Sequence, residues 1–96
     1  MPHIGSGQLV WLAQIRVRLK PIVLDPQGEA VLTALHQLDF ASVTSVRAGK
    51  FLEVSLMAAS AEEASEMVGR MCEKLLANPV IERYDFTVEA GVPGPQ

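Results

Sequence analysis

Apolar and polar residues alternate with a period of two in several stretches of the chain. Across residues 13–20, alanine, isoleucine, valine and leucine at odd positions alternate with glutamine, arginine and lysine at even ones, up to Pro21. Residues 83–88 repeat the pattern. This period is typical of strands with one buried face. Between them, the β-rich runs 43–47 and 51–57 flank Gly49 and predict either a hairpin or one long strand bent at that glycine.

Two other stretches carry the periodicity of helices. Asp25-Pro26 is typical of a helix start, with an aspartate N-cap and a proline at the first helical position. Apolar residues then recur at helical spacing as far as Leu38 and form one face of the predicted helix. Residues 60–63 read S-A-E-E, which is a capping box for a second helix. The apolar stripe of that helix continues to Asn78-Pro79, where we expect it to end.

The predicted order is therefore β-α-β(β)-α-β. It indicates an α+β two-layer sandwich of ferredoxin-like type, with two helices on one face of a mostly antiparallel sheet. We expect a flexible N-terminal tail at 1–8, one domain at 9–90 and a flexible C-terminal tail at 91–96. The other sheet face would carry Arg16, Arg18 and Glu53, and a second copy would best cover it if Phe51 or Met57 also lies there.

Composition adds an expectation of self-association. Hydrophobic residues make up 49% of the 96 residues, and the mean hydropathy is +0.24. A domain of this size has little interior, so part of the apolar surface should lie in a subunit interface. The net charge of −3 argues against nucleic-acid binding. Neither a membrane-spanning run nor a signal peptide is recognisable, and the one cysteine fits a reducing compartment, so we expect a cytoplasmic protein.

The residues that carry enzyme chemistry are few. His3 falls in the predicted tail, and His36 lies at the edge of the first helix's apolar face. Cys72 lies within an apolar helical stripe, where burial would raise its pKa and leave it inert. We therefore predict no catalytic, cofactor-binding or metal-binding residue in this chain.

The segment Arg47-Ala-Gly-Lys50 is the one candidate for a functional contact. It lacks the glycine and lysine spacing of a phosphate-binding loop. Either it is a tight turn with two solvated cations, or it contacts a partner chain or an anion. Arg47, Gly49 and Lys50 are the candidate partner-contact residues.

Three segments resemble the PurS family, the small subunit of phosphoribosylformylglycinamidine synthase. They are residues 16–30 (RVRLKPIVLDPQGEA), 46–53 (VRAGKFLE) and 71–84 (MCEKLLANPVIERY). The resemblance covers about residues 13–89. Two features depart from the family pattern: Ile22 replaces the usual glycine after Lys-Pro, and the chain begins about ten residues early, which places Leu9–Trp11 before the usual strand start.

The resemblance implies an assembly subunit without an active site of its own, in de novo purine biosynthesis. Its partners would be a large PurL-type synthetase and a PurQ-type glutaminase, bridged so that ammonia passes between them. ATP and Mg would serve the complex and not this chain. The resemblance also implies a homo-dimer or higher oligomer. The alternative is a free-standing ferredoxin-like dimer that senses a small ligand, for which only the Arg47–Lys50 segment and His36 offer polar groups.

Overall fold

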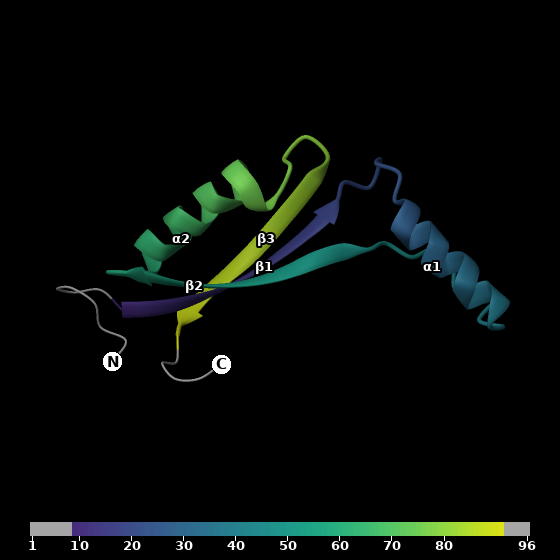
Figure 1. Cartoon of the computed structure of the whole chain (residues 1–96), viewed down its shortest axis with the longest axis horizontal. Helices are drawn as coiled ribbons and strands as arrows, with labels where there is room; N and C mark the ends of the chain where they lie inside the picture. Colours follow the sequence, from purple (N-terminus) through teal and green to yellow (C-terminus); the bar gives the residue numbers. More distant parts are fainter. Residues whose placement is uncertain (1–8, 92–96) are drawn as a thin grey trace.

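Three antiparallel strands form one sheet in the order β2-β1-β3 (Figure 1). The computed structural model describes residues 9–91 of the chain. The central strand is β1 (Leu9–Leu19), and it is flanked by β2 (Gly49–Ala58) and β3 (Glu82–Ala90). Ile15 of β1 lies opposite Leu52 of β2 and Phe86 of β3. The predicted α+β class is confirmed, and the predicted tails fall largely outside the described residues.

The core lies between one face of this sheet and helix α2 (Ala61–Met71). Ala13, Ile15 and Val17 of β1 are buried, as their alternation predicts, and they pack in one cluster with Val68 and Cys72. The side chains of Leu56, Ala58, Ala64 and Ala77 complete the buried cluster. Leu52 and Val54 also face this side, so the face of β2 was predicted correctly.

The opposite sheet face is not covered by any helix and carries the polar positions of the strands (Figure 1). Arg16 donates to the carboxylate of Asp85 on β3 at 2.8 Å. Phe51, which lies opposite Arg16 in the register of β1 and β2, is 55% exposed. Phe51 therefore shares this face with Arg16.

Helix α2 begins at the predicted capping box. The backbone N–H of Glu63 donates to Ser60 Oγ at 3.1 Å, and the Glu63 carboxylate accepts from the backbone N–H of Ala59 at 2.7 Å. After Met71 the chain widens into a π-helical segment, η1 (Cys72–Leu76), which the N–H of Ala77 closes by donating to the carbonyl of Cys72. The helical path ends just before Asn78, as the sequence predicts.

Helix α1 (Pro26–Gln37) does not lie where the sequence analysis places it. It extends beyond one end of the sheet, at the opposite end of the molecule from the N-terminal half of α2 (Figure 1). Its apolar side chains consequently lack a core to enter: Val31 is 42% exposed and Leu38 is 66% exposed. The prediction of two helices on one sheet face is therefore wrong for α1, because the periodicity identifies an apolar face without identifying what covers it.

The predicted strand at residues 43–47 is also absent. Pairing of β2 with β1 starts at Gly49, which lies opposite Arg18 near the end of β1. Residues 43–47 continue past that end, so no neighbouring strand can accept their hydrogen bonds. There is accordingly neither a hairpin nor a long bent strand at Gly49.

Two departures from the family pattern have simple structural outcomes. Ile22 is 93% exposed in a turn closed by a hydrogen bond from Val23 N to the Lys20 carbonyl, and it does not adopt a positive φ. The early residues lengthen β1, which is the central strand. Trp11 lies opposite Leu56, and its indole N–H donates to the carbonyl of Ala58 at 2.9 Å.

Candidate interaction site

Arg47 fastens the two connections that lead into and out of α1. Its Nη2 atom donates to the carbonyl oxygens of Lys20 (2.9 Å) and Val23 (3.0 Å). Both acceptors belong to the connection between β1 and α1, whereas Arg47 belongs to the connection between α1 and β2. The side chain therefore has a structural role that neither a freely solvated cation nor a simple turn would have.

Asp25 ties the same two connections together, and the sequence indicates only half of its role. Its carboxylate accepts from the backbone N–H of Gly28 at 3.0 Å, which is the expected N-cap. It also accepts from the backbone N–H of Ala48 at 2.7 Å. These two hydrogen bonds, assisted by the nearby charge of Arg47, hold the pKa of Asp25 below its ordinary value against the opposing effect of burial. The side chain of Asp25 is buried. The start of α1 is therefore held to the chain before β2 by buried hydrogen bonds and not by apolar packing.

Gly49 is required by close approach rather than by a turn. A Cβ atom at this position would lie 2.5 Å from the backbone oxygen of Val17. Lys50 follows it, opposite Val17, and is exposed. Arg47, Gly49 and Lys50 do come together: with Arg16 and Arg18 they border a surface hollow of about 310 Å³. Whether this segment contacts a partner stays a prediction.

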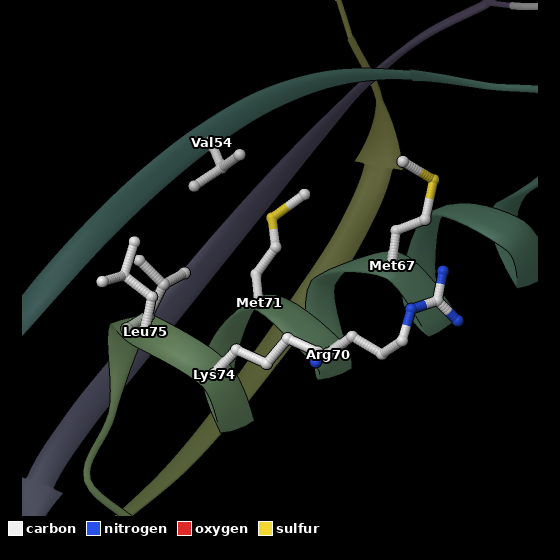
Figure 2. A pocket seen from close by; sticks show the side chains of 7 residues that line it. Val54, Met67, Arg70, Met71, Lys74 and Leu75 are labelled. Atoms are coloured by element: carbon white, nitrogen blue, oxygen red, sulfur yellow. The ribbon is translucent and has the colours of Figure 1, made fainter.

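A larger hollow, of about 570 Å³, lies beside α2, and we call it the α2 groove (Figure 2). It is lined by Val54, Met67, Arg70, Met71, Lys74, Leu75 and Leu76. Met67 and Met71 extend from the helix toward the side where Val54 of β2 lies (Figure 2). Leu75 is 81% exposed. Both methionines are partly buried and also pack against the core cluster. The sequence indicates such a groove only indirectly, because the chain has more apolar residues than a domain of this size can bury.

Cys72 and His36, the described residues with the most reactive side chains, have structural roles. Cys72 is fully buried, and burial, together with the nearby charge of Glu73, raises the pKa of its thiol. His36 Nε2 lies 2.8 Å from the carbonyl oxygen of Val43, which links α1 to the chain that follows it. Across residues 9–91, no group of three or more His, Cys, Asp or Glu side chains could hold a metal ion. In the same range, no helix is both long and apolar enough to cross a membrane.

These features define the class of the protein. It is a small α+β domain of ferredoxin-like type. Three of its surfaces are exposed to other molecules: the apolar face of α1, the α2 groove and the cationic ends of the strands. Such surfaces are typical of subunits that function in assemblies.

Comparison with known proteins then gives the family. The PurS family, described as phosphoribosylformylglycinamidine (FGAM) synthase, matches residues 12–90. The PurS subunit of this synthase from Synechocystis is 47% identical over 80% of this chain and 77% of its own. The structure of Bacillus subtilis PurS superposes with a TM-score of 0.74 at 46% identity, covering 82% of this chain and 98% of that one. The PurLQS structure from Thermotoga maritima contains a chain that superposes with a TM-score of 0.76 at 32% identity, covering 83% of this chain and 98% of that one. The chain belongs to the PurS family, and a free-standing ligand sensor is not favoured.

Proposed function

We propose that this chain is the small, non-catalytic subunit of phosphoribosylformylglycinamidine synthase in de novo purine biosynthesis. It holds a PurL-type synthetase and a PurQ-type glutaminase together and supports the transfer of ammonia between them. The assembled complex uses ATP and Mg in the cytoplasm, and the ATP and Mg sites that serve the reaction lie outside this chain. Family membership supports the proposal, as does the likeness to a chain of the Thermotoga maritima PurLQS structure.

The observation that carries the assembly role is the exposed helix α1. An amphipathic helix normally buries its apolar face, and most of its stability in a protein comes from that packing. Here Val31 and the C-cap residue Leu38 remain exposed, and the sheet of the same chain does not cover the helix. Another chain must therefore provide the cover.

We propose that a second copy of this chain provides it, in a homodimer where α1 of each copy enters the α2 groove of the other. The groove offers Met67, Met71 and Leu75 to the apolar face of α1. Charges also match: residues 26–40 contain two exposed carboxylates, Glu29 and Asp39, and neither lysine nor arginine, whereas Arg70 and Lys74 border the groove. A reciprocal exchange of this kind is self-complementary, as a two-fold interface requires.

Sedimentation velocity tests the homodimer with a matched pair of variants. Val31→Asp places a charge on the apolar face of α1, and Thr33→Asp places the same charge about 200° around the helix. We expect the wild type and Thr33→Asp to sediment as dimers and Val31→Asp to sediment near the monomer mass of 10.4 kDa. Because α1 does not enter its own chain's core, the sheet and α2 should stay folded in both variants, and only Val31→Asp should lose helical signal from the uncovered α1. A dimeric Val31→Asp or a monomeric wild type would contradict the homodimer.

Size-exclusion chromatography tests the assembly role itself. The chain is mixed with PurL-type and PurQ-type subunits from the same organism, in the presence of glutamine, ATP and Mg. The proposed function requires one peak that contains all three proteins. Separate elution of this chain from both partners would contradict it.

A further inference from the structure

Cationic residues of this acidic protein are concentrated at one end of its sheet. The chain has eight lysines and arginines and a net charge of −3. Six of these cations belong to the end of β1, the start of β2, the start of β3 and their connections: Arg16, Arg18, Lys20, Arg47, Lys50 and Arg83. Such segregation produces a local positive potential against the overall charge.

Two neighbouring cross-strand pairs on the uncovered sheet face differ in their electrostatics. Arg16 lies opposite Asp85, and the two form an ion pair of 2.8 Å. Two residues further along β1, Arg18 lies directly opposite Arg83. Like charges in directly opposed positions destabilise an antiparallel pair. The sheet therefore contains an electrostatic cost at Arg18 and Arg83 that folding alone does not explain.

A third guanidinium group joins this pair. Arg18, Arg47 and Arg83 line one hollow of about 320 Å³, with Leu19 and Pro21 completing its wall. Arg47 is held in place because its Nη2 atom donates to two backbone carbonyls, which offset none of its net charge. Within the described part of the chain, none of the three arginines forms an ion pair with a carboxylate.

Nearby carboxylates are already engaged. Asp25 accepts from the backbone N–H groups of Gly28 and Ala48. Glu82, which borders the adjacent hollow, accepts from the backbone N–H of Asn78 at 2.6 Å. Neither carboxylate forms an ion pair with the three arginines within residues 9–91, although Asp25 lies near enough to Arg47 for their charges to interact. An external anion would supply the opposite charge that Arg18 and Arg83 lack.

We propose that Arg18, Arg47 and Arg83 form a binding site for a phosphate-bearing small molecule. The planar donor fork of arginine matches the oxygens of a phosphate group, and several arginines together suit a multiply charged phosphate. The hollow has the size of a small-ligand site. Binding would replace the Arg18–Arg83 repulsion with two attractive contacts, so the anion would stabilise the fold. The site does not depend on the proposed assembly role, since the isolated chain contains all three arginines.

Isothermal titration of the purified full chain with pyrophosphate tests the site, with sodium chloride used to match ionic strength. We expect saturable binding at one site per chain, and Arg83→Gln should weaken it about tenfold or more, because a charge-assisted contact to the anion is lost. Thr87→Gln is the control substitution, since Thr87 is exposed on the same strand as Arg83 and does not line this hollow. It should bind as the wild type does.

A second measurement separates a binding defect from a folding defect. Without anion, Arg83→Gln should melt at a higher temperature than the wild type, because the repulsion with Arg18 is relieved. Pyrophosphate should then raise the melting temperature of the wild type and Thr87→Gln, and at the same concentration it should raise that of Arg83→Gln much less. Absence of wild-type binding beyond the salt control, or equal affinity in Arg83→Gln, would overturn the proposal. Binding of hexaglutamate in preference to pyrophosphate would also overturn it, since the site would then recognise carboxylates of a protein.

Discussion

The carboxylate of Asp25 accepts a hydrogen bond from the backbone N–H of Ala48, 2.7 Å away and 23 residues further along the chain. This contact joins the first turn of α1 to the residue that precedes β2. With the two hydrogen bonds of Arg47, it fixes the base of a helix that has no core beneath it. A polar clamp thus determines the direction in which α1 leaves the sheet, and the exposed apolar face of α1 follows from that direction.

Asp25 should make folding stability depend on pH. Its pKa in the folded state lies below the ordinary value of 3.8, because backbone N–H groups stabilise the carboxylate. The contribution to stability is therefore fully present above pH 3.8 and is lost as the pH falls through the folded-state pKa. Asp25→Asn should be less stable than the wild type at pH 7 and should lose less stability on acidification. Urea unfolding followed by the fluorescence of Trp11, the only tryptophan, measures both effects.

Asp39→Asn provides the control, since Asp39 is exposed and its carboxylate takes no part in the hydrogen bonds of the described residues. Acidification should destabilise it more than it destabilises Asp25→Asn, because both hydrogen bonds of Asp25 are intact in this variant. A wild-type profile in Asp25→Asn would show that the clamp does not stabilise the fold.

Arg47 and Lys50 should behave differently when each is replaced by alanine. Arg47→Ala removes two hydrogen bonds and should lower the free energy of unfolding by about 1 kcal/mol. Lys50→Ala removes an exposed side chain and should change it by less than about 0.5 kcal/mol. If Lys50 contacts a partner, the same variant should weaken binding to the synthetase and glutaminase about thirtyfold. Melting curves of both variants measure the change in stability, and partner-binding isotherms measure the change in affinity. Unchanged binding in Lys50→Ala would refute the contact predicted for that residue.

Tyr84 should ionise only in strongly alkaline solution. Its hydroxyl donates to the Glu73 carboxylate at 2.6 Å, and this bond, with burial, raises the pKa of Tyr84 to about 12. Because Tyr84 is the only tyrosine, absorbance at about 295 nm reports this group alone. The raised pKa means that the contact stabilises the fold below pH 10.0, the ordinary pKa, and is lost as the pH rises toward 12. Glu73→Gln should move the midpoint toward 10.0. A native-state midpoint near 10.0 in the wild type, with circular dichroism unchanged, would contradict the contact.

Local signals in the sequence predict the elements well, because each is encoded by neighbouring residues. The Ser60–Glu63 capping box, the Asp25 N-cap and the alternation around Ile15 all appear where expected. The position of α1 could not be predicted in this way. It depends on contacts from Arg47 and Asp25 to backbone atoms more than 20 residues away, and no side-chain pattern records those partners.

The candidate site was predicted in part for the same reason. Arg47, Gly49 and Lys50 are adjacent in the sequence, so their clustering was visible. The register of β1 with β3 places Arg18 opposite Arg83, and the hydrogen bonds of Arg47 to the Lys20 and Val23 carbonyls bring Arg47 to the same hollow. Without that register, the two arginines look like separate solvated charges.

Coupled turnover of the reconstituted complex tests the central claim most directly. The rate of amidine formation is measured for PurL-type and PurQ-type subunits with and without this chain, supplied with either glutamine or ammonium chloride. If the chain bridges the two enzymes, the glutamine-supported rate should depend strongly on its presence, whereas the ammonia-supported rate should depend on it much less. An equal glutamine-supported rate without the chain, or turnover by the chain alone, would contradict the account.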